Sequence, residues 1–189
     1  MTRQDWTAWL DDYFARFRPA FDPAVYDTLV RFRDLAVGVR ERGAKMIFAG
    51  NGASASIASH GSVDFTKQAG VRSIDFNEPN LITAYANDYG YEHWVARALA
   101  KHAQAGDAVV LISASGASPN IVRAAQYARE QGLQLVTFSG RQPDNPLRGM
   151  GDVNFWIDSH AYNVIEAVHM LWLTTVIDMV VGRAEYSVN

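Results

Sequence analysis

Two side chains suited to proton transfer, His60 and Asp64, lie four residues apart within the segment 50–67, which reads GNGASASIASHGSVDFTK. On a helix, this spacing places them on the same side. The segment follows a short apolar run at 45–49 and opens with small residues. A strand that leads through such a turn into a helix presents backbone N–H groups and the positive end of a helix dipole, which suit a phosphate or a carboxylate. The segment therefore predicts an anion cradle, with an imidazole and a carboxylate one or two turns further along.

A second run of small polar residues, at 113–120, reads SASGASPN and follows the most apolar run of the chain, 108–112. Ser118 is a favourable N-cap and Pro119 a favourable first residue for a helix. The residues ahead of them offer hydroxyl and unhindered N–H groups, which hold a phosphate without Lys or Arg. Taken alone, this run is equally compatible with an ordinary capped turn. Two such turns, each at the end of a strand, favour an anion site.

The glycines of the first segment allow another interpretation. Gly50, Gly52 and Ala55 fit the dinucleotide-binding pattern G-x-G-x-x-A, and Asp75 falls where a ribose-binding acid is expected. Such short glycine patterns recur by chance, and the chain has little length left for a separate substrate domain. A dinucleotide-binding oxidoreductase is therefore the minor alternative.

From residue 44 onward, apolar runs of strand length alternate with helix-compatible segments. The predicted strands are 45–49, 71–76, 108–113, 133–138 and 153–157, and the predicted helices include 54–68, 79–87, 91–104 and 119–131. This alternation predicts one α/β domain at 44–189, with an open parallel sheet and helices on both faces. Ligands bind such sheets at the carboxyl ends of the strands, where the strand order reverses, so both small-residue turns are expected at one site.

Both ends of the chain read as helices. In the N-terminal extension, 1–43, aromatic and aliphatic residues recur at helical spacing, and Asp22 and Pro23 mark the start of a second helix. The aromatic surface of this extension is predicted to pack against another subunit or against the same domain. The last apolar segment, 168–181, is predicted to lie in the core or between subunits. Within it, His169 is interpreted as a core histidine that is hydrogen-bonded to backbone.

Composition excludes several classes of protein. The 189 residues include 17 Lys and Arg against 20 Asp and Glu, a net charge of -3, which argues against a nucleic-acid or anionic-membrane surface. The absence of cysteine excludes disulfides, thiolate catalysis and cysteine-bound zinc. No signal peptide is evident, and no apolar run approaches the roughly 20 residues needed to cross a bilayer. A soluble cytoplasmic protein without a membrane role is expected.

The motifs together resemble the SIS (sugar isomerase) domain family, and within it the phosphoheptose isomerases. The resemblance rests on GNGAS at 50–54, NDYG at 87–90, SASGAS at 113–118 and EAVH at 166–169. It implies a three-layer αβα sandwich of flavodoxin-like type with an open five-stranded parallel sheet. It also implies a homotetramer assembled by the N-terminal helices, and a sugar phosphate as the small-molecule ligand.

The resemblance also implies roles for individual residues. Ser113, Ser115 and Ser118 match the family's phosphate-binding loop, in which Ala114 replaces a threonine and removes one hydroxyl. The sugar-lining loop is matched by Asn51, Gly52, Ala53 and Ser54, and further substrate contacts are matched by Asn87 and Asp88.

The catalytic positions depart from the family pattern. Asp64 occupies the place of the catalytic glutamate, His60 that of a histidine which in some members joins a zinc site, and Glu166 that of a glutamine. Thr174 stands where the family has its second catalytic histidine. We therefore expect His60, Asp64 and Glu166 either to act directly as catalytic residues or to hold a divalent metal such as Zn²⁺, which would polarise the sugar oxygens.

Ketose–aldose interconversion needs a base that moves a proton between neighbouring carbons and a group that stabilises the enediol oxygens. The resemblance implies the interconversion of sedoheptulose 7-phosphate and D-glycero-manno-heptose 7-phosphate, feeding a heptose-containing surface polysaccharide. The alternative is a catalytically inactive SIS protein that binds a sugar phosphate or a protein partner, because some relatives without the histidine bind a replication initiator.

Overall fold

The computed structural model describes residues 5–187, so residues 1–4 of the predicted N-terminal extension lie outside the described part. Five strands form one parallel sheet in the order β2-β1-β3-β4-β5. The strands are β1 (Met46–Gly50), β2 (Ser73–Asp75), β3 (Ala108–Ser113), β4 (Gln134–Gly140) and β5 (Val153–Ile157). The helices are α1 (Trp6–Ala15), α2 (Tyr26–Glu41), α3 (Ala53–Lys67), α4 (Pro79–Tyr89), α5 (Trp94–His102), α6 (Pro119–Glu130) and α7 (Tyr162–Val181). The short 3₁₀ helices are Arg18–Phe21, Pro23–Val25 and Pro146–Gly149.

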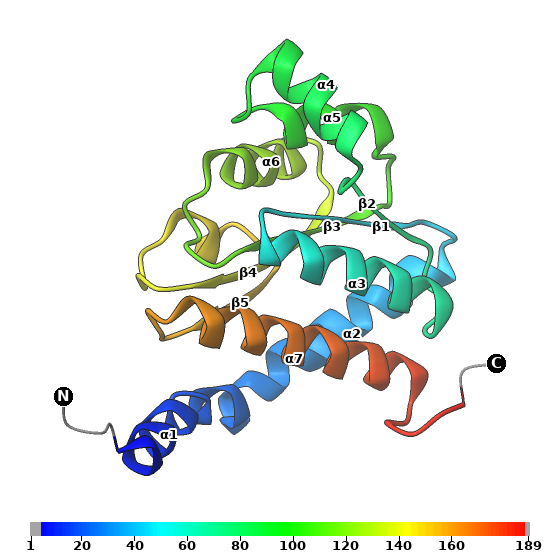
Figure 1. Ribbon diagram of the computed structural model, residues 1–189. Coiled ribbons are helices and arrows are strands. Elements are labelled where there is room, and N and C mark those ends of the chain that lie inside the picture. The colour runs from blue at the N-terminus through cyan, green and yellow to red at the C-terminus, as the bar shows by residue number, and fades with distance from the viewer. Residues whose placement is uncertain (1–4, 188–189) are drawn as a thin grey trace.

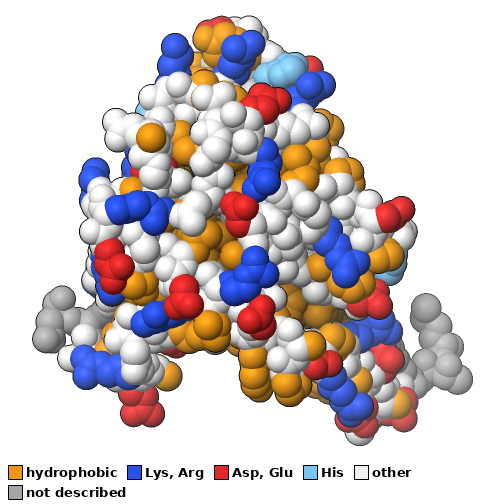
Figure 2. Space-filling model, turned by 180° about the vertical axis from the view of Figure 1, so that it is seen from behind, with side chains coloured by type: hydrophobic (Ala, Val, Ile, Leu, Met, Phe, Trp, Pro, Cys, Tyr) orange, Lys and Arg blue, Asp and Glu red, His pale blue; other side chains and the backbone are white. Residues whose placement is uncertain are grey.

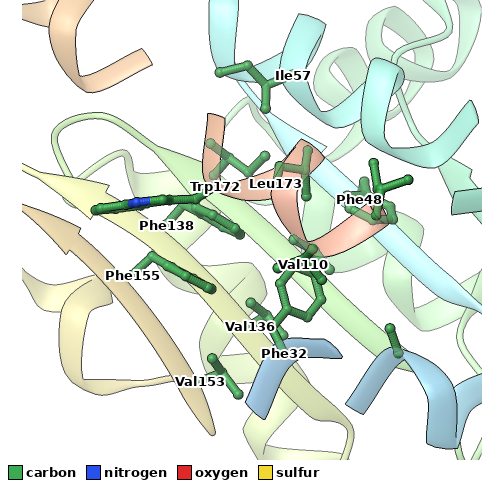
Figure 3. Close-up of a cluster of buried hydrophobic side chains, with 14 of the residues drawn as sticks. Phe32, Phe48, Ile57, Val110, Val136, Phe138, Val153, Phe155, Trp172 and Leu173 are labelled. Atoms are coloured by element: carbon green, nitrogen blue, oxygen red, sulfur yellow. The ribbon is translucent and has the colours of Figure 1, made fainter. Parts of the chain in front are cut away.

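The sheet lies between two helical layers, as predicted (Figure 1). Side chains alternate across each strand, so Phe48 and Val110 join the core beneath α2, α3 and α7, while Ile47 and Val109 join the core beneath α5 and α6. In the first core, Phe32 of α2 lies close to the rings of Phe138 and Phe155 (Figure 3). The three-layer αβα sandwich of flavodoxin-like type is therefore confirmed.

Strand β1 lies at the point where the strand order reverses, because it pairs with β2 on one side and with β3 on the other. The chain passes from β1 outward to β2, then returns across β1 to β3 and continues to β4 and β5. Loops after β1 and β3 leave the sheet in opposite directions, which opens a crevice at their carboxyl ends. The two small-residue turns follow these two strands.

The N-terminal helices differ in burial. Helix α2 buries one face, including Phe32, Ala36 and Val39, in the same core as the sheet. Asp22 accepts a hydrogen bond from the Ala24 N–H, so it caps the 3₁₀ turn that leads into α2. Helix α1, in contrast, has no buried residue. It projects from the lower part of the molecule (Figure 1), and hydrophobic side chains gather along the hollow at that lower side (Figure 2).

Helix α7 has the length and composition that would suffice to cross a membrane, and half of its most apolar window is buried. The sequence expectation that no stretch reaches that length is therefore wrong. The helix packs on α2, α3, β4 and β5, and its Trp172 donates a hydrogen bond to the Ala20 carbonyl. Its apolar character is explained by contacts on several sides, which favours the core position among the two alternatives expected from the sequence.

Candidate functional site

The two small-residue turns meet at the carboxyl edge of the sheet. Gly50, the last residue of β1, pairs in register with Ile112 of β3. The side chain of Asn51 donates to Asn120 Oδ1 at 2.9 Å, and Asn120 donates back to Asn51 Oδ1 at 2.8 Å. Asn120 is almost fully buried. This reciprocal amide pair ties the start of α3 to the start of α6, so the two turns lie side by side.

Two glycines make this close approach possible. A Cβ at Gly50 would lie 2.5 Å from backbone atoms of Ser54, so a side chain there would push α3 away from the strand. Gly116 has φ of +63°, and a Cβ there would lie 1.8 Å from Asn145 Oδ1. Asn145 in turn donates to the Gly140 carbonyl, which fixes the loop from the neighbouring strand. Both turns therefore have a backbone shape that only glycine fits.

A pocket of about 160 Å³, which we call the serine pocket, lies between the turns. It is lined by Asn51, Ser54, Ile112, Ser113, Ala114, Ser115, Ser118, Tyr162 and Glu166. The hydroxyl oxygen of Ser113 lies 3.1 Å from that of Ser118 and 3.4 Å from that of Ser115. Ser118 precedes α6 but makes no side-chain capping bond to it. Three hydroxyls and the N-terminus of a 12-residue helix therefore face one cavity, an arrangement suited to a phosphate.

Tyr162 is a pocket residue that the sequence analysis missed. Its hydroxyl accepts a hydrogen bond from Arg141, whose guanidinium also lies 5.3 Å from the Tyr162 ring centre. Arg141 is the one non-glycine residue among residues 5–187 with positive φ, at 58°, and such backbone strain gathers at functional sites. The sequence does contain a signal for this contact, because Tyr162 lies four residues before Glu166 and therefore on the same face of the helix.

Asn120 and Tyr91 were also missed. Asn120 follows Ser118 and Pro119 in the first turn of α6, where its residue type alone does not indicate a contact with Asn51. The Tyr91 hydroxyl donates to Asn51 Oδ1 at 3.1 Å, and nothing in the local pattern of the sequence indicates that contact.

His60 and Asp64 face the same side of α3 as predicted, with Nε2 of His60 3.2 Å from Oδ2 of Asp64. Their side chains are 49% and 26% exposed, and neither lines the serine pocket. Along the axis of α3, Asp64 lies ten residues, or about 15 Å, beyond Ser54, which lines that pocket. Within one chain, the predicted base and the predicted phosphate loop are therefore at separate places.

The predicted metal site is not formed within one chain. Among residues 5–187, no three His, Asp or Glu side chains come together in a way that could hold a metal ion. Glu166 faces the serine pocket at the beginning of α7, whereas His60 and Asp64 lie further along α3. The donor set His60, Asp64 and Glu166 therefore does not fit a zinc ion in this arrangement.

The other predicted contacts vary in position. Gly52 and Ala53 form the turn into α3, with Gly52 at φ of +56°, but they do not line the pocket. Asn87 donates to Asp88 at 3.0 Å; both side chains are exposed on α4, outside the pocket. Asp75, the candidate ribose ligand, accepts hydrogen bonds from Ser62 and the Asn77 N–H instead.

Two residues of α7 bear on the chemistry. The Thr174 hydroxyl donates to the carbonyls of Met170 and Leu171 in its own helix, at 3.0 and 3.1 Å. His169 is fully buried, and its Nε2 donates to the Ser139 carbonyl at 3.0 Å. Burial lowers the pKa of His169 to about 4, against a smaller raising effect of the Ser139 carbonyl. His169 is therefore a neutral core residue, as predicted.

A doubly wound parallel sheet with an anion pocket at its strand-order reversal defines a class of α/β proteins that bind phosphorylated ligands. Residues 25–140 match the family model described as the SIS domain. The chain belongs to the SIS domain family.

Its curated relatives include phosphoheptose isomerases. That of Fusobacterium nucleatum is 33% identical over 142 residues, covering 72% of this chain and 73% of the relative. That of Helicobacter hepaticus is 30% identical over 153 residues, covering 78% of each chain. The solved structure of a phosphoheptose isomerase from Neisseria gonorrhoeae has the same fold, with a TM-score of 0.82 and 23% identity over 93% of this chain and 99% of that one.

Proposed function

We propose that this protein is an aldose–ketose isomerase that interconverts sedoheptulose 7-phosphate and D-glycero-manno-heptose 7-phosphate. The observation that carries the proposal is the cluster of Ser113, Ser115 and Ser118 hydroxyls at the N-terminus of α6, tied to the turn after β1 by Asn51 and Asn120. The curated relatives that are named phosphoheptose isomerases support the same substrate.

In the proposed reaction, the ketose loses a proton from C-1 and gains one at C-2. Asp64 is the proposed base that takes the C-1 proton and returns it to C-2, because its carboxylate is partly shielded and lies beside an imidazole. His60 holds that carboxylate in place. Glu166 lines the pocket beside the phosphate-binding hydroxyls, where its carboxylate accepts hydrogen bonds from sugar hydroxyls. No step requires a metal.

This assignment needs a second subunit, because one chain does not bring Asp64 into its own serine pocket. We propose that the exposed α3 face of one subunit completes the pocket of another within a homotetramer. The exposed Trp6, Trp9 and Phe14 of α1 support an oligomer, since an unpartnered aromatic face of this kind marks an interaction surface. A cytoplasmic location is proposed along with this function.

The activity is tested by incubating the protein with sedoheptulose 7-phosphate and following aldose formation, with and without added zinc. We expect turnover in both conditions. Asp64→Asn should abolish exchange of the C-1 proton with solvent while sugar-phosphate binding is kept, because the amide cannot accept the proton. Absence of turnover by the wild-type protein in both conditions would exclude the isomerase.

Sharing of the site between subunits is tested by complementation. The variants Asp64→Asn and Ser113→Ala/Ser118→Ala are each expected to be inactive as homo-oligomers. When the two are co-expressed, mixed oligomers should regain activity. Some pockets will then combine the intact serine loop of the Asp64→Asn subunit with the intact Asp64 of the Ser113→Ala/Ser118→Ala subunit. No recovery in verified mixed oligomers would mean that each site is built from one chain.

A second candidate is a catalytically inactive protein that binds a sugar phosphate or a protein partner. The observation that favours it is Thr174, whose hydroxyl is bonded within its own helix and so offers no replacement for the histidine that the family resemblance implies. Sugar-phosphate binding without turnover would support this candidate.

A further inference from the structure

The chain turns sharply at the end of α7, after Gly182. Gly182 has φ of +88° in the left-handed region, and the N–H groups of Gly182 and Arg183 both bond to the Asp178 carbonyl, at 2.7 and 3.2 Å. This is a glycine-terminated helix end of the usual kind. As a result, the segment 183–187 does not continue along the axis of α7.

The reversal brings Tyr186 back onto α7. The Tyr186 hydroxyl donates a hydrogen bond to Asp178 Oδ1 at 3.1 Å. Asp178 is four residues after Thr174 and therefore lies on the same face of α7, about 6 Å further along the axis. A phenol thus lies one turn from the position at which the family resemblance implies a catalytic histidine.

The candidate base Asp64 belongs to α3, the helix that packs against α7. Helices α3 and α7 pack closely because Gly61 has no side chain; a Cβ there would lie 2.6 Å from Leu173 Cδ2. Asp64 is one turn of α3 beyond Gly61. Burial raises the pKa of Tyr186, and the Asp178 hydrogen bond and the charges of Asp178 and Asp64 raise it further. Tyr186 is therefore protonated at neutral pH.

We propose that Tyr186 is a catalytic proton donor of the isomerase, in place of the histidine implied at position 174. The inference rests on the proposed function. As Asp64 takes the C-1 proton, negative charge develops on the C-2 oxygen, and the phenol donates its proton there. The phenolate then recovers a proton from the C-1 hydroxyl as the C-1 carbonyl forms, and Asp64 returns its proton to C-2. Asp178 orients the phenol.

Thr174 cannot take this part, because its hydroxyl already donates within α7. His60 is already placed against Asp64 by its Nε2. Within residues 5–187, the hydroxyl of Tyr186 has one hydrogen bond, to Asp178, an acid that can hold the phenol in position.

The test compares Tyr186→Phe with Tyr127→Phe, a matched loss of a phenol hydroxyl on α6, on the other face of the sheet. With sedoheptulose 7-phosphate as substrate, Tyr186→Phe should lower kcat by roughly 10²-fold or more and change KM less than about threefold. Tyr127→Phe should match the wild type. Thermal unfolding should be alike for all three proteins, since each keeps its aromatic ring.

A rescue separates catalysis from structure. Adding Thr174→His to Tyr186→Phe should restore kcat at least tenfold, because the imidazole would then act from the position of the implied histidine. An unchanged kcat in Tyr186→Phe would overturn the inference, and so would a kcat loss that Thr174→His leaves unrepaired. Absence of turnover by the wild-type protein would overturn the proposed function and this inference together, whereas wild-type turnover with an unaffected Tyr186→Phe overturns this inference alone.

Discussion

Burial of His169 predicts a specific loss of stability in mild acid. The side chain is fully buried among Phe138, Trp172 and β4, and its Nε2 donates to the Ser139 carbonyl. The other ring nitrogen is buried and has no hydrogen-bond partner among the described residues. Protonation would therefore place a charge in an apolar setting with only one bond to support it. This explains why burial lowers the pKa of His169 to about 4.

The direction and magnitude of this change in stability follow from the linkage between protonation and folding. Between pH 6.5 and 4, the unfolded chain binds a proton at His169 and the folded chain does not, so stability falls as the pH falls through this window. A lowering of the pKa from 6.5 to about 4, at about 1.4 kcal/mol per pH unit, corresponds to about 3 kcal/mol. Domains of this size are stable by only about 5–15 kcal/mol, so the effect is large enough to measure.

The measurement is urea unfolding followed by tryptophan fluorescence at several pH values from 7.5 to 4.5, at one fixed protein concentration. The comparison is between the wild-type protein and His169→Gln, which keeps a donor for the Ser139 carbonyl but does not titrate. We expect His169→Gln to be less stable than the wild-type protein at pH 7.5. The difference in their free energies of unfolding should then become smaller by about 2–3 kcal/mol between pH 7.5 and 4.5. His160→Gln, at an exposed position, is the control, and its free energy of unfolding should differ from that of the wild-type protein by the same amount at every pH. The same pH-independent difference for His169→Gln would refute the reasoning.

Gly116→Ala should weaken sugar-phosphate binding at least tenfold by calorimetry, since its Cβ would meet Asn145; unchanged affinity would contradict the loop's role. Asp107→Ala should destabilise the fold by about 3–5 kcal/mol in urea unfolding, because the buried carboxylate accepts hydrogen bonds from the Lys45 side chain and the Lys45 backbone N–H. A loss below about 1 kcal/mol would show that these bonds contribute little to stability. Replacing Phe14, which is 63% exposed, with Ser should lower the mass of the oligomer measured by sedimentation. An unchanged mass would show that α1 is not part of the subunit interface.

Much of the fold could be predicted from local pattern. Strands β3 and β5 have the bounds that their apolar runs predicted, 108–113 and 153–157. Strand β2 is shorter than expected, Ser73–Asp75 instead of 71–76, and at its start the Val71 N–H bonds to the Phe65 carbonyl of α3 instead of a neighbouring strand. The helix predicted at 91–104 begins at Trp94, since 91–93 form a turn that brings Tyr91 to Asn51.

The phosphate side of the candidate site was more accessible to sequence reasoning than the catalytic side. Its serines and glycines lie within two short segments, and the rule for parallel sheets brings those segments together. The side chains that complete it, Asn120, Tyr162 and Arg141, come from separate elements and carry no motif of their own. Their contribution depends on contacts between residues that are distant in the chain, which spacing does not encode.

The sequence by itself determined the strand and helix order, the two turns that need glycine, and the pairing of His60 with Asp64, since all of these depend on neighbours within a few residues. Only the tertiary structure decided that Glu166, and not Asp64, faces the serines within one chain. It also decided that Tyr186 returns to α7 beside Asp178. The physical reason is that a side chain's partners across the fold depend on how helices pack against the sheet and where each helix ends, and those are properties of the whole core.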